Sequence, residues 1–171
     1  MTVLIETERL SLESWTPDQL ADLMRLHGDP GTAKYLSADG HPWTEAEASN
    51  ALATWIDNFA AQRMGKLRLI RRSDGVFVGR AGFGLQGDKD EPEIGYALLP
   101  EHRGLGYATE AASALRYWIF AATPRDYFIG FAHVENAPSL KVLRAIGMVE
   151  THVAEHEGMP CQYHVYRRPG A

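Results

Sequence analysis

Short segments with alternating or helix-spaced apolar residues follow one another along the whole chain. Residues 7–15 alternate, with Leu10 and Leu12 on one face and polar or charged side chains on the other, which predicts a strand. Branched and aromatic residues bounded by turn residues predict further strands. These are residues 67–72 and 76–85, joined by a Ser-Asp-Gly turn, then 93–99, 127–134, and a last hairpin of 149–156 and 162–167.

Helix-starting signals lie between these strands. Thr16 can cap a helix, with Pro17 at its first position and Gln19 as the partner in a capping box. Thr44 and Glu47 repeat the same pattern. The predicted helices span residues 17–27, 45–63, 104–122 and 138–146. The order β-α-α-β-β-β-α-β-α-β-β is typical of an α+β fold with a mixed sheet.

Neither the length nor the composition of the chain indicates more than one domain. A chain of 171 residues is about one domain long, and 45% apolar with 23% charged residues is close to the average for globular proteins. We see no internal repeat and no linker-like stretch. We therefore expect residues 1–171 to form one domain.

The charge and the cysteine content exclude several classes of function. A net charge of -5 is opposite in sign to that of a nucleic-acid binder, and it mildly favours a cationic partner. The single cysteine, Cys161, cannot form an internal disulfide and fits a reducing compartment. The longest apolar runs are far shorter than the ~20 residues that cross a bilayer, and the N-terminus lacks the apolar core of a signal peptide. We expect a cytoplasmic protein that binds neither nucleic acid nor membrane.

Histidines in the last predicted hairpin do not suggest a metal site. His152, His156 and His164 have strand-like spacing and no recognised metal-binding pattern, so no metal is expected. His133, at the end of the preceding strand, fits either a catalytic base or a polar residue at the rim of a site.

The most informative segment is residues 93–112, EIGYALLPEHRGLGYATEAA, in which a strand leads through a glycine-rich loop into a helix. The first turn of a helix leaves backbone N–H groups unpaired and attractive to anions, and Gly104 and Gly106 would let a phosphate approach them. A close-packed structural turn explains the same glycines equally well. Residues 82–87 also spell G-x-G-x-x-G, but an acidic loop follows them instead of a helix, so we interpret that match as accidental.

Two motifs resemble those of the GNAT superfamily of acetyl-CoA-dependent N-acetyltransferases. Residues 103–108, Arg-Gly-Leu-Gly-Tyr-Ala, match its Arg/Gln-x-x-Gly-x-Gly/Ala signature, and residues 136–139 with Gly147-Met148 are similar to its Asn-x-x-Ser helix. The runs ETERLSLESWTPDQL and EIGYALLPEHRGLGYATEA more narrowly resemble the RimJ/RimL-like group, which acetylates protein N-termini and, in other members, small amines. The resemblance implies a mixed, mostly antiparallel twisted sheet flanked by helices.

The resemblance also implies acetyl-CoA as co-substrate and assigns residues to it. The pantetheine arm would pair with the strand end at Leu98 and Leu99 and contact Asn136, although asparagine is also a favoured helix cap. The pyrophosphate would lie on Arg103, Gly104, Gly106, Tyr107, Ala108 and Thr109.

Catalytic candidates follow from the reaction. An ammonium has no lone pair, so a base must remove a proton, and Glu93 opens the strand that leads to the glycine loop. A solvated strand-end glutamate is the alternative interpretation. Many superfamily members protonate the departing thiolate with a tyrosine, but that position is Leu143 here. Ser139 is the remaining motif candidate, and a serine at this place can also bond to backbone or cofactor.

The leading hypothesis is an N-acetyltransferase that acetylates a primary amine, either a small molecule or a peptide N-terminus, by direct attack in a ternary complex. A non-catalytic acetyl-CoA or CoA sensor, or an acyltransferase for longer chains, remains open. The early helices and the last hairpin should wall the acceptor site. Dimers are common among the proteins that this chain resembles, so a homodimer is a further expectation.

Overall fold

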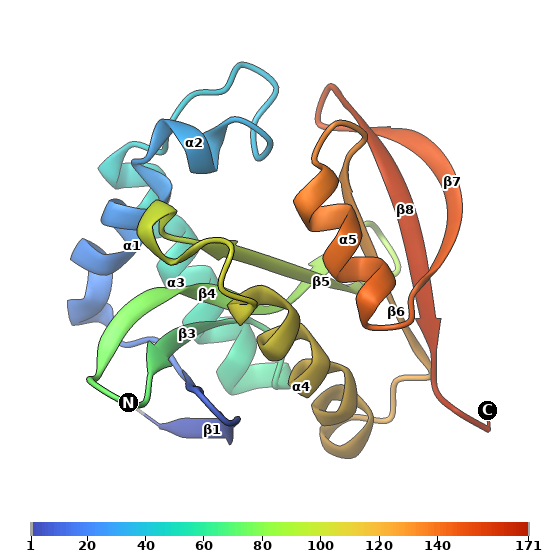
Figure 1. Ribbon diagram of the computed structural model, residues 1–171, viewed down its shortest axis with the longest axis horizontal. Helices are drawn as coiled ribbons and strands as arrows, with labels where there is room; N and C mark the ends of the chain where they lie inside the picture. The colour runs from blue at the N-terminus through green and yellow to red at the C-terminus, as the bar shows by residue number, and fades with distance from the viewer. Residues whose placement is uncertain (1, 171) are drawn as a thin grey trace.

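One sheet of eight strands runs through the part of the chain that the computed structural model describes, residues 2–170 (Figure 1). The strand order is β1-β2-β3-β4-β5-β6-β8-β7, and all neighbours are antiparallel except β5 and β6. The predicted α+β class with a mixed, mostly antiparallel sheet is confirmed. The strands are β1 (Val3–Glu6), β2 (Leu10–Glu13), β3 (Lys66–Arg71), β4 (Val76–Gln86), β5 (Glu91–Leu98), β6 (Tyr127–His133), β7 (Val149–His156) and β8 (Met159–Arg167).

Helices cover both faces of the sheet. One buried cluster joins α4 and α5 to the strands, and a second joins α1 and α3 to the opposite face. The α-helices are α1 (Leu20–His27), α2 (Pro30–Ala33), α3 (Glu45–Gln62), α4 (Tyr107–Ala122) and α5 (Ala137–Ala145), and short 3-10 turns span Pro17–Gln19 and Pro100–His102.

The capping signals form as the sequence predicts. The Thr44 backbone N–H donates to the Glu47 carboxylate at 2.7 Å, and the Glu47 N–H donates to the Thr44 hydroxyl at 3.3 Å. The Thr16 N–H donates to the Gln19 side chain at 3.0 Å, but the turn that it caps is a 3-10 turn leading into α1. Reciprocal caps thus fix the starts of the helical segments that follow Thr16 and Thr44.

The N-terminal region differs from its prediction. Residues 7–15 contain only the four-residue strand β2, which pairs with β1, a strand that the alternation did not reveal. Thr7 makes the turn between them, because its N–H and hydroxyl both donate to the Leu10 carbonyl. The short helix α2 was also not predicted; Asp29 caps it by accepting from the Thr32 N–H at 2.8 Å.

The helix predicted from residue 104 begins three residues later, at Tyr107. Gly104 has φ +74° and Gly106 has φ +83°, in the left-handed region that a helix cannot contain. Both glycines therefore belong to the loop, and Gly106 is the N-cap residue of α4.

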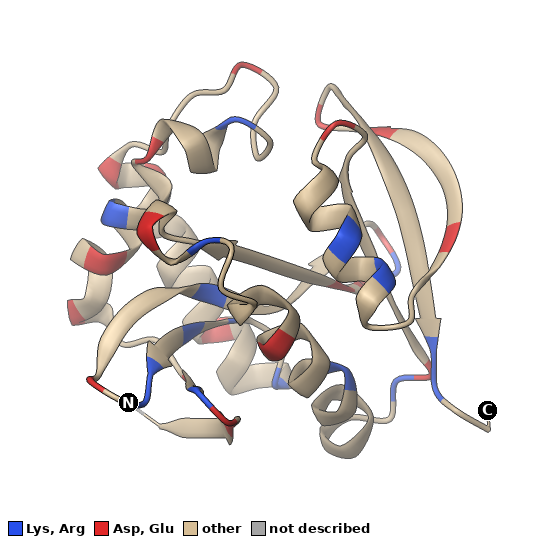
Figure 2. Ribbon diagram, viewed as in Figure 1, with Lys and Arg blue, Asp and Glu red and all other residues tan. Residues whose placement is uncertain are grey.

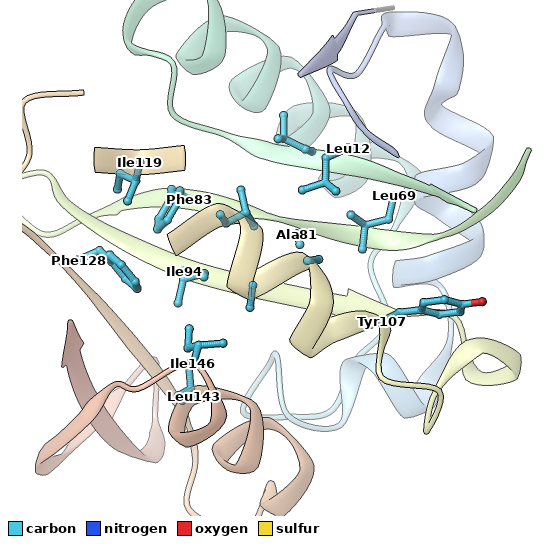
Figure 3. Packing of buried hydrophobic residues seen from close by; sticks show 14 of the residues in the cluster. Leu12, Leu69, Ala81, Phe83, Ile94, Tyr107, Ile119, Phe128, Leu143 and Ile146 are labelled. Atoms are coloured by element: carbon cyan, nitrogen blue, oxygen red, sulfur yellow. The ribbon is translucent and has the colours of Figure 1, made fainter. Parts of the chain in front are cut away.

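The main core lies between the sheet and α4. Figure 3 shows Ala81, Phe83 and Ile94 packed beneath this helix, with Phe128 beside them on β6. The helix itself is largely uncharged, as its mostly tan ribbon in Figure 2 shows. Alternate residues of β4 and β5 point into this core, so the residues between them must face the opposite side of the sheet.

Candidate active site

β5 and β6 lie side by side for only a short distance and then separate. Their parallel pairing includes Glu93 with Ile129 and Ile94 with Gly130, and no pair follows. The Leu99 N–H donates to Val78 of β4. Because peptide directions alternate along a strand, the peptide groups of Tyr96 and Leu98 face away from β4, toward the gap. This edge is open to an extended ligand.

The two leucines assigned to the pantetheine arm differ in position. Leu98 lies on the open edge, and its carbonyl accepts from Nε of Arg103 at 3.1 Å. Both backbone groups of Leu99 are already used, since its N–H donates to Val78 and its carbonyl accepts from His102. The structure therefore places Tyr96 and Leu98, and not Leu99, along the gap.

The glycine loop presents a run of unpaired donors. The backbone N–H groups of residues 104–109 make no hydrogen bond to any other residue that the structure describes. A Cβ atom added at Gly104 would meet nothing within 4 Å, and one at Gly106 would meet only the Arg9 side chain, at 3.3 Å. The positive end of α4 and this open space fit an anion of pyrophosphate type.

The Arg103 side chain, which the resemblance assigns to the pyrophosphate, contacts residues at the start of α2 instead. Its Nη2 donates to the Thr32 hydroxyl at 3.0 Å and lies 3.4 Å from the Asp29 carboxylate. Arg103 thus connects α2 to the end of β5. In this arrangement its charge is shared with Asp29.

Arg9 supports the loop from the other side, which the sequence analysis missed. Its Nη1 donates to the Leu105 carbonyl at 2.8 Å, and its Nε pairs with Glu110 of α4 at 2.7 Å. Its guanidinium also lies over the ring of Tyr107, 4.5 Å from the centroid. The turn after β1 therefore fixes the loop, and no local pattern in the sequence signals such a long-range contact.

A cavity of about 280 Å³ opens beside the separated strands. Glu93, Asn136 and Ser139 all line it, so the structure brings these three candidates together, and Tyr96 lines it as well. Residues from the loop after α2 and from the β7–β8 hairpin form its walls. These wall residues are Tyr35, Leu36, Trp43, His156, Glu157, Met159 and Cys161.

A buried ion pair forms part of the cavity floor. The Lys66 ammonium lies 3.3 Å from Oε2 of Glu93 and 3.3 Å from the Gly82 carbonyl. Burial lowers the pKa of Lys66; the charge of Arg80 adds to this and that of Glu93 opposes it. A Cβ at Gly95 would lie 2.5 Å from the ammonium, so this glycine makes room for it. Gly82 and Gly84, from the accidental G-x-G-x-x-G match, lie beside Lys66: the Gly82 carbonyl accepts from its ammonium, and a Cβ at Gly84 would lie 3.7 Å from it.

Arg80 is the second buried cation of the floor. Its Nε donates to Nε2 of His27 at 3.0 Å, and the His27 ring stacks on Trp43 with centroids 3.7 Å apart. Burial, with Arg80 and Lys66 nearby, lowers the pKa of His27 to about 2, so the ring is neutral and can accept this bond. An arginine inside the otherwise apolar strand segment 76–85 is a signal that sequence reasoning could have used.

The hydroxyl groups of Ser139 and Tyr96 meet at the cavity. The Ser139 hydroxyl donates to the Tyr96 oxygen at 3.1 Å, and the Tyr96 hydroxyl donates to the Ser139 carbonyl at 2.8 Å. Burial raises the pKa of Tyr96, which keeps it protonated. Asn136 caps α5 by accepting from the Ser139 N–H at 3.4 Å, and Leu143 is buried in the core.

His133 and Cys161 also line the cavity. Nδ1 of His133 accepts from the Glu135 N–H, and its ring lies 5.3 Å from that of Tyr35. Cys161 is buried, and burial raises the pKa of its thiol. Within residues 2–170, no three His, Cys, Asp or Glu side chains gather as metal ligands would. In the same range, no helix has the length and apolar character of a membrane span.

Comparisons with known proteins show the family. The family model described as "Acetyltransferase (GNAT) domain" matches residues 9–149. An uncharacterized N-acetyltransferase, p20, from Bacillus licheniformis is 25% identical over 142 residues, covering 82% of this chain and 79% of its own.

Solved structures share the fold. An acetyltransferase from Agrobacterium tumefaciens superimposes with a TM-score of 0.84 at 23% identity, covering 98% of this chain and 95% of its own. RimL, a ribosomal L7/L12 alpha-N-protein acetyltransferase solved with coenzyme A, gives 0.82 at 15% identity, covering 97% and 98%. At these identities the likeness concerns the fold alone.

Proposed function

The chain belongs to the GNAT family of N-acetyltransferases, and from that premise we propose that it transfers an acetyl group from acetyl-CoA to a primary amine by direct attack in a ternary complex. One observation carries the proposal: the separated edge of β5 connects two sites. At one end lies the glycine loop with the unpaired N–H groups of residues 104–109, here called the anion cradle, and at the other lies the cavity with the buried carboxylate of Glu93. The proposal treats residues 1–171 as one catalytic domain. It includes the RimJ/RimL-like grouping, supported by the runs quoted above.

The residues of this chain divide the binding of acetyl-CoA between them. The N–H groups of residues 104–109 would hold the pyrophosphate, and the backbone groups of Tyr96 and the N–H of Leu98 would pair with the pantetheine arm. Asn136 faces the same cavity from the start of α5. When bound there, acetyl-CoA supplies an activated acetyl thioester.

Glu93 is the proposed base. Its Oε2 is held by Lys66, whereas Oε1 accepts no hydrogen bond from any described residue. This oxygen can take a proton from the ammonium form of the amine, directly or through a water, and so expose the nitrogen lone pair. At the other side of the cavity, Ser139 with its partner Tyr96 is the proposed proton donor to the departing thiolate.

The test is the pH–rate profile of Glu93→Gln, with the rate measured as the release of free thiol from acetyl-CoA. General-base catalysis contributes about 10²–10⁴-fold, so we expect kcat at neutral pH to fall by at least ~100-fold and to recover partly at high pH. Glu91→Gln is the matched control, because Glu91 lies two residues earlier on β5 and accepts from the Tyr127 hydroxyl instead. An unchanged profile for Glu93→Gln would exclude Glu93 as base.

The reaction itself is tested by the wild-type protein on a panel of amino acids, polyamines, aminoglycosides and peptides that start with alanine or serine. Thiol release that depends on the amine supports the proposal. Tight binding of acetyl-CoA without thiol release from any amine would identify a sensor. Faster release from longer acyl-CoA donors would identify a different acyltransferase.

A further inference from the structure

Three cationic side chains project from β3 and β4 on the face of the sheet away from α4. Lys66 pairs with Glu93 at 3.3 Å. Arg68 pairs with Glu13 at 3.5 Å and with Asp22. Arg80 alone forms no ion pair with any residue that the structure describes.

The Arg80 guanidinium is buried, held and incompletely bonded. The residue is 6% exposed, and it lines the cavity. Nε donates to His27, but neither Nη atom donates to a described residue. Burial lowers the pKa of Arg80 only to about 10, so it remains charged at neutral pH. The Trp55 ring, 5.3 Å from the guanidinium carbon, and the Glu93 charge, which raises the pKa of Arg80, partly offset the cost of burying this cation. Neither group accepts a hydrogen bond from the Nη atoms, which indicates that a ligand supplies the acceptor.

The phosphates of CoA are not that partner. Ala81 and Phe83 point into the core beneath α4, so Arg80, directly before Ala81, points to the other face. The anion cradle lies at the start of α4, on the core side. The ligand group that meets Arg80 therefore belongs to the second substrate.

Resting on the proposed function, we propose that Arg80 binds an anionic group of the acceptor, so that the acceptor is a small amine that also carries a carboxylate or phosphoryl group. A guanidinium presents two parallel N–H donors that match the oxygens of either group. With Nε fixed by His27, the two Nη groups are the donors left for it.

The order of charges along the floor matches such a molecule. Glu93, Gly95 and Ala97, every second residue of β5, lie on the same face of the sheet, and Ala97 is paired with Arg80 on the neighbouring strand β4. The proton acceptor therefore lies toward one end of the floor and the guanidinium toward the other. The cavity of about 280 Å³ is slightly below the ~300–1,000 Å³ typical of ligand pockets, which favours a small molecule.

This local charge reverses the expectation drawn from the whole chain. The net charge of -5 mildly favours a cationic acceptor. However, among the buried charges of the cavity floor only Arg80 has no ion pair with a described residue, whereas the Glu157 carboxylate lies on the exposed wall. A local field of this kind outweighs distant surface charges, which salt screens.

The experiment compares matched acceptors: L-α-amino acids, their carboxamides, and the corresponding amines without a carboxyl group, with aminoalkyl phosphates as a second anionic series. The measured quantity is kcat/KM from thiol release. We expect the wild-type protein to prefer the anionic member of each pair by about 100-fold, most of it in KM. The two anionic series then distinguish carboxylate from phosphoryl as the preferred group.

Substitutions of Arg80 test whether this residue causes the preference for anionic acceptors. Arg80→Gln should reduce the acid-to-amide ratio of kcat/KM to about one, and Arg80→Lys, which keeps the charge but loses the fork, should retain part of it. Arg167→Gln, at the exposed end of β8, is the control and should keep the wild-type ratio. Binding of acetyl-CoA by each variant shows that it is folded.

The outcomes separate the two proposals. If no amine is acetylated, the proposed function fails. If amines are acetylated but carboxamides or polyamines react as well as acids, the function stands and the role of Arg80 is refuted. If Arg80→Gln does not fold, the wild-type ratio and that of Arg80→Lys decide the question on the same terms.

Discussion

The two faces of the central strands differ sharply although they alternate residue by residue. Toward α4, the strands present apolar side chains, among them Leu67, Phe83 and Ile94. Toward the cavity, the same strands present Lys66, Arg80 and Glu93. Because successive side chains of a strand point to opposite faces, a residue that packs in the core is followed directly by one that faces the cavity. The apolar face holds the sheet and the glycine loop in place, and we propose that the polar face recognises and activates the acceptor.

Buried charges would be a poor way to stabilise this sheet. Replacing a buried ion pair with well-packed apolar residues is often neutral or stabilising, so its presence calls for another reason. Local violations of the packing rules concentrate at functional sites. The polar face, with two buried cations and a buried carboxylate, is such a place.

The largest effect should come from removing a ring on the apolar face. Phe128 is fully buried and packs edge to face on Phe83, with ring centroids 5.3 Å apart. Phe128→Ala should lower the free energy of unfolding by about 3–5 kcal/mol, measured by urea denaturation. The protein that remains folded should keep the wild-type preference among acceptors. A loss under 1 kcal/mol would mean that this face is not the main source of stability.

The next effect is at the end of α4. Gly106→Glu introduces a carboxylate where the loop presents its unpaired N–H groups, at a residue with φ +83°. We expect acetyl-CoA to bind at least ~100-fold more weakly, about 2.7 kcal/mol, by calorimetry. Gly87→Glu is the control, because Gly87 also has positive φ and open space but lies in the β4–β5 turn. Equal affinity of both variants for acetyl-CoA would show that the anion cradle does not bind its phosphates.

A smaller effect tests the polar face itself. A Cβ at Gly95 would lie 2.5 Å from the Lys66 ammonium, whereas one at Gly84 would lie at an ordinary 3.7 Å. Gly95→Ala should therefore displace Lys66 from Glu93 and lower kcat by roughly 10-fold, about 1.4 kcal/mol. Gly84→Ala should stay close to wild type. If the two variants behave alike, the position of Lys66 does not matter for turnover.

Local patterns predicted the elements that depend on local chemistry. The cap at Thr44 and the hairpin at residues 73–75 form where turn and capping residues specify them. The glycine loop was also found, although its left-handed residues shortened the predicted helix. These features depend on residues only a few positions apart.

The remaining features depend on partners that are distant in the sequence. The orientation of Arg80 is fixed by His27, 53 residues earlier, and Lys66 meets Glu93 27 residues later. Arg9 reaches Glu110 across 101 residues. Glu93 read in isolation fits a solvated strand end, and although Arg80 stands out inside an apolar strand, only the fold shows which groups the two residues meet.

The most direct test of the division between the two faces is a two-substrate kinetic matrix. Initial rates are measured while acetyl-CoA and an anionic amine are varied against each other, for wild type, Gly106→Glu and Arg80→Gln. We predict that Gly106→Glu raises KM for acetyl-CoA alone and that Arg80→Gln raises KM for the amine alone. If both substitutions raise the same constant, the two faces do not divide the substrates as described.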